Sequence, residues 1–213
     1  MTARRPRRGF TLLELLIVIL ILSILMGITV VGVSHFIGKG KEAKTRVLID
    51  QLTRAVEAYH DSEAGGGDYP PTSLRERGAG TNGVNEGVES LLAHLMSRRG
   101  GPFVEDLKES DYGNTDNDTI TGWDPQWIFG DSRAREIVDA WGNPLVYFHW
   151  RDYEHPSSYM TRYKLRNKRY VNARPARDRN KTWPRYRKFM IWSMGPDGGN
   201  KDGHGDGPCN WRQ

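Results

Sequence analysis

The C-terminal tail holds the residues best suited to bind a metal ion. Between Ser193 and Trp211 it carries Asp197, Asp202 and Asp206 among many glycines. Clustered carboxylates repel one another unless a cation lies between them, and calcium accepts about six to eight oxygen ligands in a flexible geometry. Glycine allows a loop to wrap tightly around such an ion. The residues themselves leave two interpretations open, a Ca²⁺-binding loop and a disordered acidic tail.

A second run of oxygen-bearing side chains extends from Asn114 to Asp118. Its spacing is similar to the start of an EF-hand loop, in which alternate residues bind calcium. The sixth position, however, is Thr119 where glycine is expected, and the twelfth is Pro125 where glutamate is expected. We therefore favour a solvated loop over a metal site here.

Few residues are arranged for catalysis. The chain has no Gly-x-Ser-x-Gly elbow, no His-Glu-x-x-His pair and no phosphate-binding loop. Its single cysteine, Cys209, has no partner for a disulfide, and neither it nor His204 has companions at the spacing of a zinc site. We expect a protein that is not an enzyme.

A carboxylate stands within the most apolar stretch of the chain. Glu14 is the one charged residue among the 24 from Phe10 to Val33. A helix of that length extends roughly 36 Å, enough to cross a membrane, where a carboxylate costs at least ~2.5 kcal/mol. The N-terminus of a helix in another copy would supply a positive partner. Four arginines in residues 1–9 should hold that end in the cytoplasm.

Periodic apolar residues predict the elements that position these groups. Helical spacing between Lys41 and His60, with no strong breaker before it, predicts one long helix from about Phe10 to Ser62. A short helix is expected over residues 86–97, and strands over 145–150 and 189–193. The predicted fold class is α+β, with a long helix packed on a small antiparallel sheet.

A basic insertion separates the two predicted strands. Residues 160–188 carry twelve Lys and Arg against one acid, Asp178. We favour a surface hairpin that docks on the acidic body of a neighbouring subunit. Interleaved aromatic and arginine side chains can also bind nucleic acid, and lipid or polysaccharide is a further anionic partner. These alternatives stay open.

Residues 9–15, Gly-Phe-Thr-Leu-Leu-Glu-Leu, resemble the processing site of type IV pilins and of type II secretion pseudopilins. The resemblance implies that a prepilin peptidase cuts after Gly9 and methylates the new amino group of Phe10. It also implies that Glu14, then the fifth residue of the mature chain, meets the N-terminal amine of an adjacent subunit.

Two further stretches resemble the major pseudopilin of type II secretion. Residues 139–147, Asp-Ala-Trp-Gly-Asn-Pro-Leu-Val-Tyr, are similar to a signature of that family, with Ala140 where proline is usual. The tail is similar to its C-terminal calcium loop, although one aspartate of the family pattern is missing, for which Asp202 or Asn200 would substitute. The calcium ligands that this likeness implies are Ser193, Asp197, Asp202 and Asp206.

The resemblance implies a type IV pilin-like fold with a leader at 1–9, a transmembrane and assembly helix at 10–33 and a periplasmic globular domain at 34–213 that ends in the loop 193–211. The implied function is a structural subunit held by a single pass in the bacterial inner membrane, which then polymerises into a periplasmic pseudopilus for protein secretion. The implied partners are other copies of the chain, prepilin peptidase, minor pseudopilins and the inner-membrane assembly platform. The alternative is a type IV pilin or minor pilin for adhesion, motility or DNA uptake. Nucleic acid is an expected partner only through the basic insertion.

Overall fold

A computed structural model of the chain describes residues 10–205 and 207–212, without the side chains of residues 28–35. Gly9 and Asp206, two of the predicted site residues, therefore lie outside the described part. The chain divides into two compact units, the second of which begins at Lys41. This boundary is seven residues beyond the start of the predicted globular domain at residue 34.

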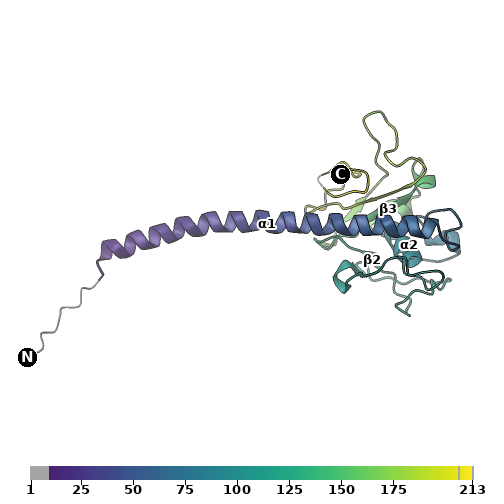
Figure 1. The fold of residues 1–213 in the computed structure, drawn as a ribbon, viewed down its shortest axis with the longest axis horizontal. Coiled ribbons are helices and arrows are strands. Elements are labelled where there is room, and N and C mark those ends of the chain that lie inside the picture. The colour runs from purple at the N-terminus through teal and green to yellow at the C-terminus, as the bar shows by residue number, and fades with distance from the viewer. Residues whose placement is uncertain (1–9, 206, 213) are drawn as a thin grey trace, which may run out of the picture. The chain divides into compact units, whose positions relative to one another are not determined.

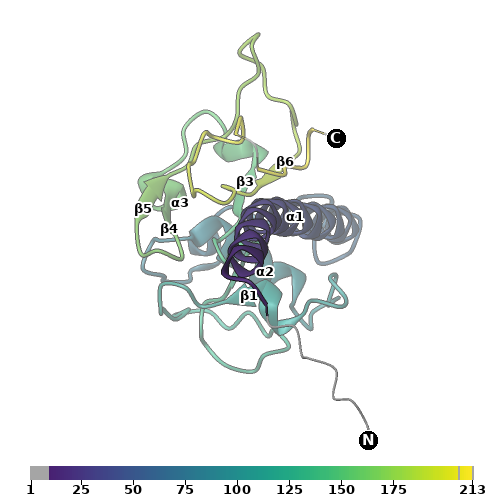
Figure 2. The ribbon, with the colours of Figure 1, turned by 90° about the vertical axis from the view of Figure 1, so that its left-hand side faces the viewer.

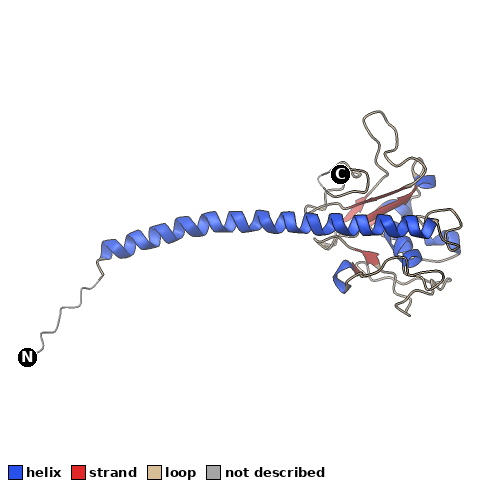
Figure 3. Ribbon diagram, in the orientation of Figure 1, coloured by secondary structure: helices blue, strands red, loops and turns tan. Residues whose placement is uncertain are grey.

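The described residues form an α+β structure (Figure 1). The α-helices are α1 (Leu12–His60), α2 (Glu86–Leu95) and α3 (Ser158–Thr161). The 3₁₀-helices are η1 (Leu74–Arg77), η2 (Glu109–Asp111) and η3 (Trp150–Asp152). The strands are β1 (Tyr112–Gly113), β2 (Glu136–Ile137), β3 (Val146–His149), β4 (Arg162–Lys164), β5 (Tyr170–Asn172) and β6 (Phe189–Trp192). Most of the second unit is loop, and its strands are short (Figure 3).

The long helix α1 matches the prediction for residues 10–62 closely. Its last turns bury one face, which includes Leu48, Leu52 and Val56, as the helical spacing of these residues requires. Beyond the helix, the backbone N–H of Gly67 donates to the carbonyl of His60 at 3.1 Å. Gly67 has a φ of 81° there, a conformation that favours glycine at a helix C-terminus.

Helix α2 lies inside the second unit, and all ten of its residues are buried. It agrees with the short helix predicted for residues 86–97. The helix approaches β3 so closely that a methyl group at Gly87 would meet the backbone carbonyl of Tyr147 and the hydroxyl of Tyr163. Glycine at this position is what permits the contact between α2 and β3.

The two predicted strands pair as expected. β3 and β6 are antiparallel, with Val146 opposite Trp192 and His149 opposite Phe189. In the described part of the chain, β1 pairs with β2 and β4 with β5, so each sheet has two strands. Figure 2 shows the β4–β5 hairpin beside α3. The small antiparallel sheets and the N-terminal helix are consistent with a pilin-like fold.

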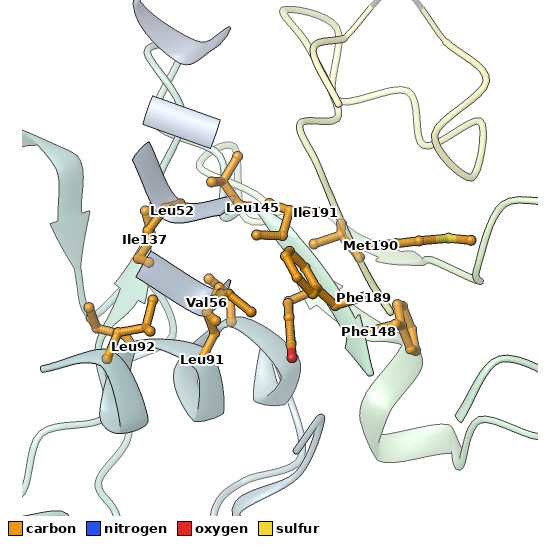
Figure 4. Packing of buried hydrophobic residues seen from close by; sticks show 14 of the residues in the cluster. Leu52, Val56, Leu91, Leu92, Ile137, Leu145, Phe148, Phe189, Met190 and Ile191 are labelled. Atoms are coloured by element: carbon orange, nitrogen blue, oxygen red, sulfur yellow. The ribbon is translucent and has the colours of Figure 1, made fainter. Parts of the chain in front are cut away.

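The core of the second unit forms where α1, α2 and the β3–β6 pair meet (Figure 4). The side chains shown there come from both helices and from the strands and the residues around them. Those labelled are Leu52, Val56, Leu91, Leu92, Ile137, Leu145, Phe148, Phe189, Met190 and Ile191. Each is at most 1% exposed.

The basic insertion contains the predicted hairpin, formed by β4 and β5, but this hairpin lies only partly on the surface. Tyr163 and Leu165 are buried in the core. Further along, Lys188 and Arg185 reach Glu57 of α1, at 2.8 and 3.6 Å. The stretch 162–166 alternates charged and apolar side chains, a pattern of a half-buried strand that the density of positive charge conceals.

Candidate assembly and cation-binding sites

Glu14 caps the helix that it belongs to. Its carboxylate oxygen Oε2 accepts hydrogen bonds from the backbone N–H and the hydroxyl of Thr11, at 2.8 and 2.9 Å. The backbone N–H of Glu14 in turn donates to the Thr11 hydroxyl at 3.2 Å. This reciprocal pair is a capping box, which satisfies backbone donors at the start of α1. The Thr-x-x-Glu spacing of Thr11 and Glu14 is the signal in the sequence that could have predicted this capping box.

The side chains around Glu14 form an apolar surface that is largely exposed in the described part of the chain. Phe10 is 82% exposed, and the large apolar residues from Leu12 to Met26 are 45% exposed or more. A continuous apolar surface of this kind marks contact with a membrane or with other proteins.

No helix among the described residues is long and apolar enough to cross a membrane. The membrane span expected for residues 10–33 is thus not found in that part of the structure, and its last residues fall among the undescribed side chains 28–35.

Ser193, the first predicted calcium ligand, is buried where β6 ends. Its hydroxyl donates to the Asp139 carboxylate at 2.6 Å and accepts from the backbone N–H of Gly195 at 2.9 Å. The amide of Asn143 donates to the Gly195 carbonyl at 3.1 Å, so the turn at 139–147 and the C-terminal loop hold each other in place. Burial raises the pKa of Asp139, and its hydrogen bonds, with that from Ser193 foremost, act in the opposite direction.

The other predicted calcium ligands are used by their own turns. An oxygen of Asp197 accepts from the backbone N–H of Gly199 at 2.9 Å. An oxygen of Asp202 accepts from the backbone N–H of Arg174 and from the side chain of Asn200, at 2.8 and 2.7 Å. The described residues of the tail include no trio of acidic, histidine or cysteine side chains close enough to share a metal ion. Calcium binding by this loop therefore stays a prediction.

The guanidinium group of Arg212 lies beside several backbone carbonyls of the tail. The terminal nitrogen Nη2 of Arg212 donates to the backbone carbonyls of Gly203, Gly205 and Gly207, at 2.6, 2.9 and 3.3 Å. Its Nε donates to the Cys209 sulfur at 3.1 Å. The positive charge of Arg212 among these carbonyl oxygens therefore stabilises this part of the tail.

The basic insertion also lines a hollow of about 920 Å³. Four residues that line it are positively charged, Arg162, Arg174, Arg177 and Lys201, and two are negatively charged, Glu154 and Asp202. Elsewhere in the insertion, Arg169 donates to the Gly198 carbonyl at 2.9 Å, so the insertion also contacts the C-terminal loop. This positively charged hollow is the feature of the second unit best suited to an anionic partner.

A comparison with protein families gives one match, to the prokaryotic N-terminal methylation motif, over residues 4–30. The matched stretch contains the predicted cleavage site and Glu14, and it supports the class of type IV pilin-like and pseudopilin subunits. Chains with this motif are processed by prepilin peptidase, become methylated at the N-terminus and polymerise. The chain matches no curated protein and no solved structure.

Proposed function

We propose that the chain is a pseudopilin, a structural subunit that polymerises through α1 into a periplasmic pseudopilus for type II protein secretion. The observation that carries this proposal is the exposed apolar surface of residues 10–26, which contains the capped Glu14 and lies within the methylation motif. A lone chain cannot keep such a surface in water. The inner membrane would cover it before assembly, and neighbouring helices would cover it in the filament.

Glu14 would change partners on assembly. In the single chain its carboxylate is satisfied by Thr11. The methylated amine of Phe10 in an adjacent subunit carries a full positive charge, so its bond to the Glu14 carboxylate joins two opposite charges, whereas Thr11 supplies only neutral donors. The capping box thus holds the acid ready in the monomer, and assembly would exchange the hydroxyl for an amine.

Glu14→Ala should still be processed but should not assemble with wild-type efficiency, because the amine of the next subunit loses its partner. Co-expression with the wild type and cross-linking of filaments measures this. Asp50→Ala, an exposed change on the same helix, is the matched control and should assemble normally. Normal filaments from Glu14→Ala would refute the proposed role.

The runner-up is a type IV pilin or minor pilin for adhesion, motility or DNA uptake, which the basic hollow favours. Loss of the gene separates the two, because a secretion pseudopilin is needed for the export of folded proteins. Intact export together with loss of surface filaments or of DNA uptake would favour the pilin.

We also propose that the C-terminal loop binds Ca²⁺ through Ser193, Asp197, Asp202 and Asp206, with a structural role. The support is the resemblance of the loop and its chemistry of oxygen ligands. Asp197→Asn should then weaken calcium binding by the full chain in detergent and lower its melting temperature only when calcium is present. An equal decrease in the presence of a chelator would show that Asp197 acts through its turn alone.

A further inference from the structure

The most unusual buried group of the second unit is the side chain of Glu89 in α2. It is 0% exposed, and neither of its carboxylate oxygens has a hydrogen-bond partner. A buried carboxylate without a partner is strongly disfavoured, and such groups are rare in proteins unless they are paired or bind a metal. Glu89 therefore needs a partner that the described residues do not supply.

Two further carboxylates, from the loop at 114–118, face Glu89. One oxygen each of Glu89, Asp116 and Asp118 lies within 4.8 Å of the others. The Oδ1 atoms of Asp116 and Asp118 are also buried without a partner. Their second oxygens are held by Asn82, whose side chain donates to Asp116 at 2.9 Å and whose backbone N–H donates to Asp118 at 3.3 Å. One oxygen from each of the three side chains is thus close enough to the others to bind the same ion.

The loop is built to keep this arrangement. The Asn114 side chain donates to the Asp118 carbonyl at 2.7 Å and accepts from the Asp118 backbone N–H at 3.0 Å. These two bonds close a turn that carries both aspartates. Half-buried aspartates in a fixed turn differ from the solvated loop that the sequence analysis favoured.

No positive side chain in the described structure neutralises the three acids, since none of them forms an ion pair there. The nearby acids already have partners. Glu86 accepts from Thr81 and Arg75, at 3.0 and 3.4 Å. The remaining one, Glu136, accepts from Asn85 and Thr115.

Charge and burial act together on the cluster. Burial, followed by the charges of Asp118 and Asp116, raises the pKa of Glu89 well above its usual range. Burial and the neighbouring Asp116 raise the pKa of Asp118 to about 6. Both shifts describe the same condition, an excess of negative charge in a place with little water, which a bound cation would relieve.

We propose that Glu89, Asp116 and Asp118 form a binding site for a hard divalent cation, with calcium as the best fit. All three ligands offer oxygen, and the trio contains no sulfur or imidazole nitrogen, which favours calcium over zinc. Oxygens on opposite sides of a calcium ion lie about 5 Å apart, in line with the spacing of the trio. This site is distinct from the C-terminal loop.

The role of the ion is structural. Asp116 and Asp118 come from a loop, whereas Glu89 belongs to α2 in the core, so a shared ion joins the loop to the helix. An ion that binds only the folded chain stabilises it by an amount that rises with the logarithm of its concentration above the dissociation constant. At the calcium concentrations found outside the cytoplasm, the globular unit would be held together partly by this contact.

The test uses the full chain in detergent micelles, freed of metal with a chelator and then dialysed against CaCl₂, MgCl₂ or ZnCl₂. Bound metal per chain and the melting temperature are measured. The wild type should bind calcium and melt several degrees higher with it. Glu89→Gln should lose one equivalent of bound calcium, or bind that equivalent about tenfold more weakly. It should also lose most of the increase in melting temperature that calcium gives the wild type.

Three further variants make the result specific. Asp118→Asn should show the same loss as Glu89→Gln. Because Asp118 lies in a loop, this variant tests the site even if the change at Glu89 in the core prevents folding. Glu154→Gln, an exposed change of the same type, should bind as the wild type does. Asp197→Asn should retain this equivalent whatever happens at the C-terminal loop. Calcium binding that is unchanged in both Glu89→Gln and Asp118→Asn, or a wild type that binds none of the three metals, would overturn the proposal.

Discussion

Individual polar and charged side chains of this protein are either held by hydrogen bonds within the chain or placed where a group of opposite charge could bind. Glu14 is capped by Thr11 in the monomer, Ser193 is tied to Asp139, and Glu89 is buried without a partner. The contacts and the burial of each of these side chains depend on a residue that is distant in sequence or on a nearby turn. A carboxylate shows its role only when its surroundings are known.

His94 is a buried base whose protonation opposes folding. Its ring Nδ1 lies 2.7 Å from the Ser90 carbonyl, to which it donates, while Nε2 has no partner and the ring stacks on Trp123. Burial lowers the pKa of His94 to about 4, assisted by the charge of Arg77 and opposed by the bond to Ser90. The folded pKa is thus below the unfolded value near 6.5.

Between these two pKa values the unfolded chain binds more protons, so the contribution of His94 to stability falls as the pH drops from about 6.5 to 4. The loss relative to His94→Gln should reach roughly 3 kcal/mol. Denaturant unfolding of both proteins at pH 7 and pH 4 measures the difference. Parallel pH profiles for the two proteins would contradict the assignment.

At the scale of elements, close contacts decide the arrangement. Helix α2 approaches β3 because Gly87 has no side chain. Alanine usually stabilises a helix relative to glycine by about 1 kcal/mol, but here its methyl group would press on Tyr147 and Tyr163. Gly87→Ala should therefore destabilise the protein by about 1–3 kcal/mol, the usual cost of overpacking.

The control for this change is Gly40→Ala in α1, where an added methyl group meets nothing within 4 Å. This variant should be neutral or slightly stabilising in the same denaturant titration. A higher free energy of unfolding for Gly87→Ala than for the wild type would contradict this prediction, because it would show that α2 and β3 can move apart without a loss of stability.

The elements were predictable because their signals are local. Apolar periodicity gave the limits of α1, α2, β3 and β6 to within a few residues. The strand at 162–164 was missed because arginine and lysine dominate its composition, although every second residue is buried. The trio around Glu89 could not be foreseen, since 27 residues separate Glu89 from Asp116 and only the packing of the loop on α2 brings them together.

The C-terminal loop shows the same limit. Its resemblance predicts a set of calcium ligands, yet the side chains of Asp197 and Asp202 are directed by local turns. Hydrogen bonds from Arg212 engage three carbonyls of the tail. Such contacts depend on tertiary structure and have no signature in the sequence.

At the scale of the whole molecule, the chain combines a polymerisation element with a globular unit that needs no partner to bury its core. The apolar surface of residues 10–26 has no function in a soluble monomer. The methylation motif over residues 4–30 covers the same stretch and supports a pilin-like subunit that polymerises. The globular unit would then determine what the filament contacts.

The most direct test of this account is mass spectrometry of the N-terminus of the protein from cells that contain a prepilin peptidase. The mature chain should lack residues 1–9 and begin at Phe10 with one additional methyl group on its amine. A Gly9→Leu variant should keep its leader and fail to enter filaments. A wild-type chain that retains its leader in those cells, or that begins at an unmodified residue elsewhere, would contradict the claim that it is a pilin-like subunit.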